Sequence, residues 1–427
     1  MSKVGISVLR SRLAAWLATM MIAGCAAQPS EKLAQIDASL ARAGSYLISK
    51  QSDNGAWQSE TYGCFKAGLA LTPHVMNALF FLPQIRDDAL PAYRSGVDYL
   101  ASFVDDDGKL NVGPPEMLFP VYSAASASRA VVLASRSPKN LQTQQAWLAL
   151  LRERQLNEKL GWQAEDPQYG GWGFSLAVPH KPTPGQTRPQ FFESNLSATV
   201  YGVAALRSAK IPADDPAFAQ ALLFAERCQN FPVESDETDA AYDDGGFFFI
   251  PGDAVQNKAG PAGVDRFDRQ RFHSYGTMTA DGLRILVRCG MPTDHPRVVA
   301  AKKWLEWNFS ATENPGRFNP DREVIRNATY YYWAWAVSHA FLALRADQIE
   351  TAEGNVRWAE ALADELIRRQ KPDGAWTNIY TDAKEDDPLV ATPFAAAALA
   401  ICRTVVAGEL KTIGNECPRL VAPHSGQ

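Results

Sequence analysis

Three ionisable residues stand where they could carry chemistry. Asp281 lies inside the apolar segment 275–283, where a buried carboxylate is costly unless it is paired or functional. It could act as a general acid, or it could form a salt bridge with Arg284, three residues further along a helix. His273 and Asp244 precede that segment and complete the candidate catalytic set. A histidine at a helix start is also a common hydrogen-bonding group, and Asp244 falls in a predicted turn.

A dense run of aromatic residues could line a ligand cavity. On a predicted helix over 330–344, Tyr331 and Trp335 share one face, with Tyr332 and His339 close beside it. Rings with a polar tip suit an apolar or sugar-like ligand, and their faces can stabilise a cation. The same rings could instead be core residues between two helical layers. The candidate ligand-binding residues are Trp172, Phe247, Tyr275, Tyr331, Tyr332, Trp335 and His339.

The elements that would position these residues are helices of two kinds. Strand-like alternation is scarce, whereas apolar residues recur at helical spacing. Segments charged on one side cover residues 36–51, 90–104, 139–155, 216–230, 296–309 and 356–370. Segments apolar nearly all round, which must be buried, cover 73–82, 122–134, 196–208, 275–288, 330–344 and 390–405. Six alternations predict an all-α fold, an (α/α)6 toroid whose inner helices surround a central cavity.

A short pattern recurs at the ends of the charged helices. Residues 51–57 and 370–376 both fit Gln-x-x-x-Gly-x-Trp. The glycine ends the helix through a left-handed turn, and the tryptophan then packs back on neighbouring helices. Degenerate copies are expected at residues 105–108, 168–174, 242–247 and 314–318. The Gly- and Pro-rich stretches 161–193 and 231–272 are predicted to shape one mouth of the cavity.

The N-terminus has the layout of an export signal, with a basic start and a short apolar run over 13–22. It ends in Ala23-Gly24-Cys25, which resembles the lipobox of bacterial lipoproteins and implies a mature N-terminus at Cys25 carrying acyl chains such as palmitate. An ordinary cleaved signal is the alternative. We expect a signal peptide over 1–24, a linker over 25–30, one toroid domain over 31–415 and a tail over 416–427. Ala26 favours sorting to the periplasmic face of the outer membrane.

Composition limits the partners. The chain of 427 residues is 46% hydrophobic with a formal net charge of −5, which favours a packed core and argues against nucleic acid as a partner. Cys402 and Cys417 are the expected disulfide pair in an oxidising periplasm. No Cys-x-x-Cys occurs, so no metal site is expected.

Several segments that follow one another in a fixed order along the chain resemble a known family: residues 169–174, 194–199, 228–230, 244–247, 274–279, 313–316 and 330–332. Together they resemble the bacterial prenyltransferase/squalene oxidase repeat proteins. These are relatives of squalene-hopene cyclase in the superfamily of terpenoid cyclases and protein prenyltransferases. The resemblance implies the same toroid and a cavity for a hydrophobic ligand, with an isoprenoid as the candidate.

The catalytic motifs of those relatives are absent. The sequence holds no Asp-x-Asp-Asp for alkene protonation, no Asp-Asp-x-x-Asp for magnesium diphosphate and no Asp-x-Cys for zinc. We therefore expect a membrane-anchored binder of a hydrophobic ligand, without a cofactor. An envelope polysaccharide lyase or glycosidase is the second hypothesis, and it requires facing acidic or acid and basic groups among Asp243, Asp244, His273 and Asp281. A non-catalytic partner-binding protein with a packed centre is the third.

Overall fold

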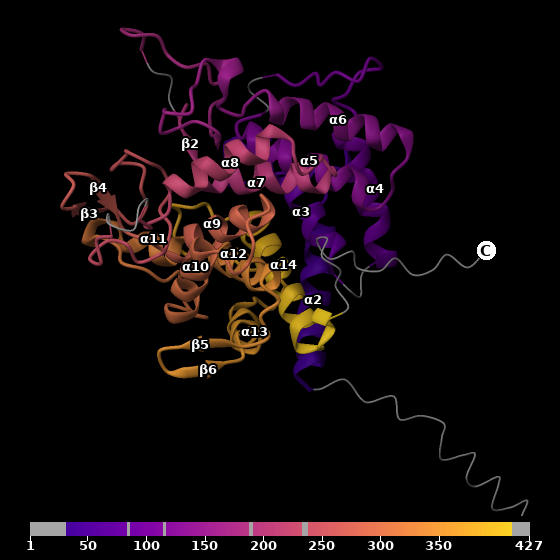
Figure 1. The fold of residues 1–427 in the computed structure, drawn as a ribbon. Helices are drawn as coiled ribbons and strands as arrows, with labels where there is room; N and C mark the ends of the chain where they lie inside the picture. The colour runs from indigo at the N-terminus through magenta and orange to yellow at the C-terminus, as the bar shows by residue number, and fades with distance from the viewer. Residues whose placement is uncertain (1–30, 83–85, 114–116, 188–190, 233–237, 412–427) are drawn as a thin grey trace, which may run out of the picture.

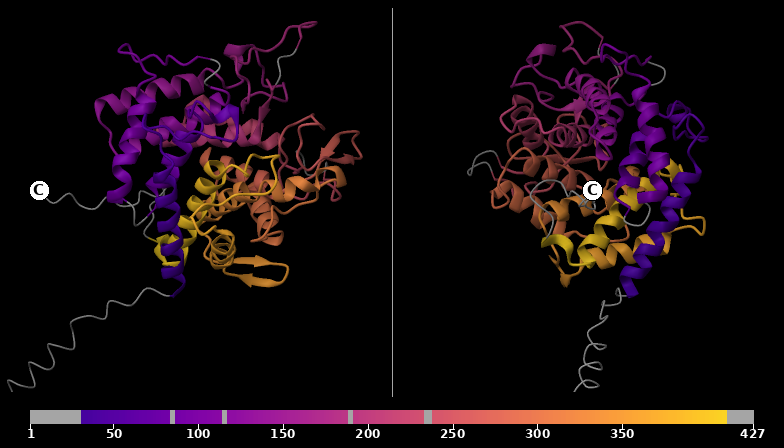
Figure 2. Two further views of the ribbon diagram at one scale, coloured as in Figure 1. Left: turned by 180° about the vertical axis from the view of Figure 1, so that it is seen from behind. Right: turned by 90° about the vertical axis from the view of Figure 1, so that its right-hand side faces the viewer.

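The structure is a computed structural model that describes residues 31–82, 86–113, 117–187, 191–232 and 238–411. Within these ranges, two rings of six helices dominate (Figures 1 and 2). The inner ring consists of α3 (Leu71–Phe80), α5 (Pro120–Leu133), α7 (Leu196–Ser208), α9 (Gly276–Arg288), α12 (Tyr330–Ala343) and α14 (Pro388–Val406). The outer ring consists of α2 (Glu31–Ser49), α4 (Arg86–Ala101), α6 (Pro138–Arg152), α8 (Pro216–Arg227), α10 (Pro296–Trp307) and α13 (Trp358–Arg369).

The inner ring is closed. Each inner helix packs against the next along the chain, and α14 packs against α3. The first and last parts of the chain also meet: outer helix α2 (indigo) packs against inner helix α14 (yellow) and against the last outer helix, α13 (Figure 1). This arrangement confirms the (α/α)6 toroid that the sequence predicts. The proposed lipidation site Cys25 and the cysteine Cys417 lie outside the described residues.

Composition explains which helices form which ring. Residues of α9 are buried from Gly276 through Leu286 without interruption, as expected of a helix surrounded on all sides. Several outer helices begin with a proline in the first turn after a capping residue. The Asp215 carboxylate accepts the Ala217 N–H at 3.0 Å before α8. His295 Nδ1 accepts the Arg297 N–H at 3.3 Å before α10.

The recurring glycine pattern joins neighbouring outer helices. Gln370 Nε2 donates to the carbonyls of Gly374 (3.0 Å) and Ser39 (2.9 Å), so the end of α13 is tied to α2. The Trp376 indole N–H donates to the Leu366 carbonyl at 2.7 Å. Its backbone N–H donates to Thr392 of the inner helix α14 at 3.0 Å.

We call this arrangement, in which a glutamine side chain bonds the backbone at a glycine turn and a buried ring follows, the glutamine–glycine joint. It recurs three more times among the described residues. The glutamines are Gln51, Gln155 and Gln229, the glycines Gly55, Gly170 and Gly245, and the buried rings Trp57, Trp172 and Phe247. Two of these glutamines were not predicted, because insertions separate Gln155 and Gln229 from their glycines. The sequence pattern pointed to Gln168 instead of Gln155. All four glycines have φ between +81° and +94°.

Shorter elements connect the helices of the rings. The short helix α11 spans Glu323–Ala328, and 3-10 turns lie at Gly63–Phe65, Glu158–Leu160, Pro320–Arg322 and Glu409–Lys411. Three antiparallel strand pairs are formed by β1 (Trp172–Gly173) with β2 (Ser194–Asn195), β3 (Pro261–Val264) with β4 (Gln270–Phe272), and β5 (Ile349–Thr351) with β6 (Gly354–Val356). Among the described helices, α14 alone is long and apolar enough to cross a membrane, and 72% of that stretch is buried inside the toroid. Its burial is that of an inner-ring core helix.

Candidate functional site

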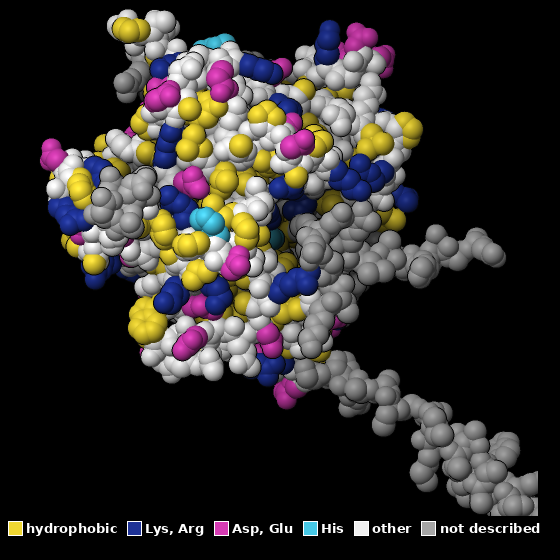
Figure 3. Space-filling view, viewed as in Figure 1, with side chains coloured by type: hydrophobic (Ala, Val, Ile, Leu, Met, Phe, Trp, Pro, Cys, Tyr) yellow, Lys and Arg dark blue, Asp and Glu magenta, His cyan; other side chains and the backbone are white. Residues whose placement is uncertain are grey.

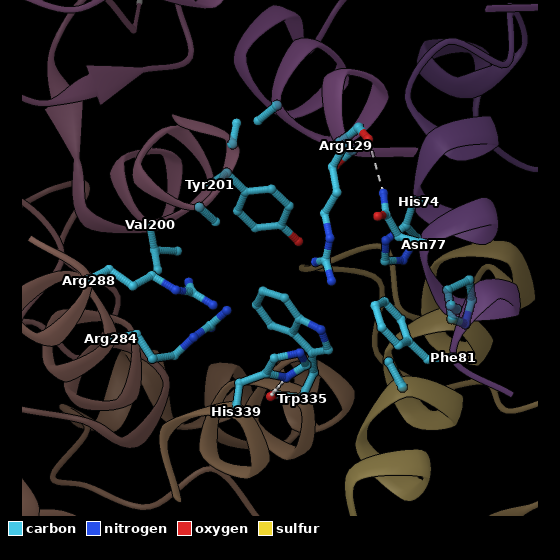
Figure 4. A pocket seen from close by; sticks show the side chains of 17 residues that line it. His74, Asn77, Phe81, Arg129, Val200, Tyr201, Arg284, Arg288, Trp335 and His339 are labelled. Carbon is cyan, nitrogen blue, oxygen red and sulfur yellow. Dashed lines mark hydrogen bonds between the residues drawn. The ribbon is translucent and has the colours of Figure 1, made fainter. Parts of the chain in front are cut away.

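A cavity lies at the centre of the toroid, and every helix of the inner ring contributes to its wall. Its empty space is about 640 Å³, which includes the open mouth. Dark-blue basic side chains are set back in a hollow near the middle of the face seen in Figure 3. The labelled wall residues are His74, Asn77, Phe81, Arg129, Val200, Tyr201, Arg284, Arg288, Trp335 and His339 (Figure 4). Small side chains, Ala78, Ala125, Ser126, Ala204, Ala205, Pro393 and Ala397, complete the wall and leave the space open.

The wall lies away from the long insertions. Its residues come from the middle and C-terminal parts of the inner helices. The stretches 161–193 and 231–272 lead instead into the N-termini of α7 and α9. None of their described residues lines this cavity, so the expectation that these insertions shape its mouth does not hold here.

Three guanidinium groups converge on the cavity. Arg129 reaches in from α5, while Arg284 and Arg288 reach in from α9 (Figure 4). Arg284 also lies over the Trp335 ring, 4.2 Å from its centroid, and Arg129 lies 4.9 Å from the centroid of the Phe81 ring. Among the described residues that line the wall, these arginines are the charged side chains, and no Asp or Glu stands beside them.

The two histidines of the wall are neutral at pH 7. Burial lowers the pKa of His74 to about 4, and its Nε2 lies 3.2 Å from the Val390 carbonyl. Burial also lowers the pKa of His339 well below its usual value. Repulsion by Arg284 and by the other two cavity arginines lowers it further. His339 Nδ1 lies 2.8 Å from the Trp335 carbonyl. Neither ring adds charge to the cavity at neutral pH.

Aromatic rings form one side of the cavity. The rings of Tyr201 and Trp335 are stacked with centroids 5.5 Å apart, and Tyr332 stacks on Trp335 at 5.7 Å. Behind them, Tyr122 packs edge-on against Tyr201 at 4.9 Å. The Tyr122 hydroxyl is 2.6 Å from Ser197 Oγ. This continuous stack holds the Trp335 ring in place in the cavity wall.

Asp281 lies behind the wall. It is fully buried, and Arg284 Nη1 donates to its Oδ1 at 2.8 Å, so the salt bridge considered from the sequence is present. The Tyr332 hydroxyl donates to its second oxygen. Burial raises the pKa of Asp281 to about 6, against the lowering effect of Arg284 and Tyr332. Both carboxylate oxygens are thus occupied by neighbouring side chains.

Asp244 and His273 lie together in a different place, outside the cavity wall. Asp244 accepts hydrogen bonds from Ser274 Oγ at 2.7 Å and Trp304 Nε1 at 3.1 Å. The backbone N–H of His273 donates to the Gly260 carbonyl, and partial burial lowers the pKa of its ring. The nearby Asp243 is paired with Arg271 at 2.6 Å. The Asp244 contacts tie the insertion to α10 and to the segment just before α9, and they do not bring an acid and a base together across the cavity.

The aromatic candidates divide in the same way. Trp335 and His339 are in the cavity wall, and Tyr332 is partly exposed directly behind them. Trp172 and Phe247 are fully buried in the glutamine–glycine joints, and Tyr275 is buried at the start of α9. Tyr331 is 3% exposed, and its hydroxyl donates to the Thr377 carbonyl at 3.3 Å. These four rings lie outside the wall.

Several wall residues were missed from the sequence. Arg129, Arg288, His74, Asn77 and Tyr201 line the cavity without having been singled out. Arg129 did carry a signal, because it is a cation within an otherwise small and apolar helix. A charge inside an apolar helix is costly unless it is paired or functional, and this reason, which identified Asp281, holds equally for Arg129. Among the described residues, no group of three or more His, Cys, Asp or Glu side chains could hold a metal ion.

Comparison with known proteins identifies the class of fold. No family model and no curated protein matches the sequence. Cellobiose 2-epimerase from Spirochaeta thermophila is similar in structure, with a TM-score of 0.56 at 14% identity, over 90% of this chain and 100% of that chain. The type II terpene cyclase MstE from Scytonema, solved with geranylgeranyl dihydroxybenzoate, has a TM-score of 0.54 at 13% identity, over 88% and 99%.

Both relatives are (α/α)6 toroids, and the likeness places this chain in the same structural class. Identities this low show the fold alone, because toroids of one architecture carry unrelated chemistries. The function therefore depends on the side chains of the cavity wall and not on the fold. Its polar groups can bind and orient a ligand, and its aromatic side can hold an apolar part of it.

Proposed function

We propose that the chain is a lipoprotein of the bacterial envelope, anchored through Cys25, whose toroid binds a hydrophobic small molecule in the central cavity. An isoprenoid compound is the candidate ligand. The observation that carries the proposal is a wall that combines the aromatic rings of Tyr201 and Trp335 with buried polar atoms left without a partner. Asn77 Oδ1 and Arg284 Nε are buried wall atoms with no hydrogen-bond partner among the described residues.

Such atoms favour a cavity that is meant to be filled. A buried polar group without a hydrogen bond costs free energy, so most are satisfied in native proteins. Both amide hydrogens of Asn77 are used, by the Pro73 carbonyl at 2.7 Å and the Ser126 carbonyl at 3.0 Å, which leaves its oxygen as the open acceptor. Both atoms lie just beneath the surface of the empty cavity, so a ligand would pair with them after a small shift of the surrounding side chains.

The rest of the wall suits an apolar part of the ligand. Trp335, Tyr201 and Phe81 contribute aromatic rings to the wall, and the alanines leave room beside them. The substrate bound to the Scytonema cyclase, geranylgeranyl dihydroxybenzoate, joins an isoprenoid chain to a polar ring. A molecule of that general kind suits a cavity with one aromatic and one polar side.

Catalysis on envelope polysaccharide is less well supported. Hydrolysis of a glycoside usually needs two carboxylic groups placed on either side of the scissile bond. The described wall residues include no carboxylate, and Asp281 behind them is held by Arg284 and Tyr332. We therefore propose binding rather than bond cleavage.

The test is extraction of bound small molecules from the full chain. The protein is purified from a lipid-containing bacterial host and its extract is examined by mass spectrometry beside two variants. Ala204→Trp fills the cavity, and Ala134→Trp places the same ring outside the cavity, at the end of α5. We expect a near-stoichiometric hydrophobic compound in the wild type and in Ala134→Trp, and its loss in Ala204→Trp. A wild-type protein free of any such compound would contradict the proposal.

A further inference from the structure

We propose that the cavity contains a hydroxyl subsite on α3, in which His74 Nδ1 and Asn77 Oδ1 accept hydrogen bonds from an alcohol end of the ligand. The inference rests on the proposed function, because it assigns the polar end of the molecule that the cavity holds. It adds the chemistry of the ligand: an uncharged amphiphile with a hydroxyl head and an apolar remainder.

The first support is the orientation of the Asn77 amide. Its nitrogen donates to the Pro73 carbonyl at 2.7 Å and to the Ser126 carbonyl at 3.0 Å. A carbonyl only accepts, so these two contacts identify the nitrogen and use both of its hydrogens. The amide oxygen is buried and has no hydrogen-bond partner in the described part of the chain. Because that oxygen can only accept, the partner it needs is a donor.

The second support is the position of the proton on His74. Its Nε2 lies 3.2 Å from the Val390 carbonyl, and since the carbonyl only accepts, Nε2 carries the hydrogen. The ring is neutral at pH 7, so Nδ1 holds a lone pair and is an acceptor. His74 and Asn77 are three residues apart on α3, and both side chains line the cavity (Figure 4). The two acceptors therefore belong to the same part of the wall.

The third support comes from α12, where the wall again offers an acceptor. His339 Nδ1 lies 2.8 Å from the Trp335 carbonyl, so Nδ1 carries the hydrogen and Nε2 is the acceptor. His74, Asn77 and His339 are only partly buried although they stand on inner-ring helices, and all three line the cavity. These three uncharged side chains thus call for hydrogen-bond donors on the ligand.

A hydroxyl is the donor that suits this wall. An ammonium group also donates, but the described wall residues include no carboxylate to pair with it, and the charges of Arg129, Arg284 and Arg288 would repel it. An alcohol is uncharged, so its burial avoids the cost of burying an ion. An ether or a hydrocarbon would leave Asn77 Oδ1 unpaired.

The test compares two probes that differ in one hydrogen-bond donor. Binding of geraniol and of geranyl methyl ether to the full chain is measured by isothermal titration calorimetry, each below its solubility limit. The probes share the isoprenoid chain and the oxygen, but the ether cannot donate. One hydrogen bond to an otherwise unpaired acceptor implies a preference of about tenfold for geraniol.

Variants locate the subsite. Asn77→Leu and, independently, His74→Phe each remove an acceptor and keep a side chain of similar size. Both should lower the affinity for geraniol toward that for the ether and leave ether binding unchanged, whereas a merely structural defect would weaken both probes together.

Asn140→Leu is the matched control. Asn140 also donates its amide to a backbone carbonyl, that of Ser135 at 3.0 Å, but it stands on outer helix α6 and does not line the cavity. Its replacement should leave both affinities as in the wild type. Circular dichroism confirms that each variant is folded, and the comparison of the two probes on the wild type remains decisive if a cavity variant fails to fold.

The outcomes separate the two claims. Equal affinity of the wild type for geraniol and its methyl ether overturns the hydroxyl subsite and leaves the hydrophobic cavity standing. A preference for geraniol that Asn77→Leu and His74→Phe both leave intact also overturns the subsite, because the hydroxyl would then be bound elsewhere. Failure of both probes to bind contradicts the proposed function itself.

Discussion

Replacing Gly374 by alanine tests how tightly the toroid closes on itself. Gly374 sits in the joint between the last outer helix, α13, and the first, α2. Its φ is +94°, and an added Cβ would lie 2.4 Å from the carbonyl oxygen of Arg42. That distance is far below van der Waals contact, and the obstacle is backbone rather than a flexible side chain. The two ends of the ring would have to move apart.

The expected loss of stability has two parts. A non-glycine residue in the left-handed region costs about 1–2 kcal/mol. Forcing an extra carbon into a packed contact costs about 1–3 kcal/mol more. Together they predict that Gly374→Ala lowers the free energy of unfolding by roughly 2–5 kcal/mol.

Gly408→Ala is the matched control. Gly408 also has a positive φ, +72°, but no atom lies within 4 Å of its added Cβ. It should lose only the conformational part, about 1–2 kcal/mol. Urea unfolding followed by circular dichroism at 222 nm measures both variants. If Gly374→Ala were no less stable than Gly408→Ala, close approach of the chain ends would not be what holds the ring shut.

Three further predictions concern two buried ionisable residues, Arg284 and His74, and the lipid anchor. Arg284→Met should destabilise the protein by about 3–5 kcal/mol in urea unfolding, because Asp281 is left buried without its partner, and adding Asp281→Asn should recover part of that loss. The pKa of His74 falls from about 6.5 when unfolded to about 4 when folded, so the stability from its neutral ring is present above about pH 6.5 and is lost as the pH falls toward 4. Relative to His74→Gln, the wild type should therefore lose about 2 kcal/mol of unfolding free energy between pH 7.5 and pH 5, and an equal pH dependence of the two proteins would contradict the assignment. Cys25→Ser should move the protein from the membrane to the soluble fraction and abolish incorporation of labelled palmitate, whereas continued labelling would show that the acyl chain is elsewhere.

Helix periodicity predicted the double ring well, because the pattern that separates inner from outer helices is local in the sequence. An inner helix is apolar on all sides and an outer helix on one, and both patterns are visible in short windows of sequence. The bounds of α7, Leu196–Ser208, match the predicted helix residue for residue. The outer helices end slightly earlier than predicted, and at α2 and α13 the reason is that Gln51 and Gln370 belong to the joint rather than to the helix.

The cavity could be predicted only in part. Trp335 and His339 are found by helical spacing from Tyr331, but which face of an inner helix meets the axis depends on how all the helices tilt. That is why Tyr331 faces the joint region and Arg288 faces the cavity. Asp281 was found because an isolated charge in an apolar helix needs a reason. Applied to Arg129, the same reasoning would have indicated a basic centre.

The most direct measurement of the central claim is X-ray diffraction from crystals of the full chain grown with 12-bromododecanoate, recorded at the bromine absorption edge. We predict anomalous density inside the inner ring, within contact distance of Trp335 in the cavity wall. We also predict that Ala204→Trp crystals lose this density. Bromine density confined to the outer surface, with the central cavity unchanged, would contradict it.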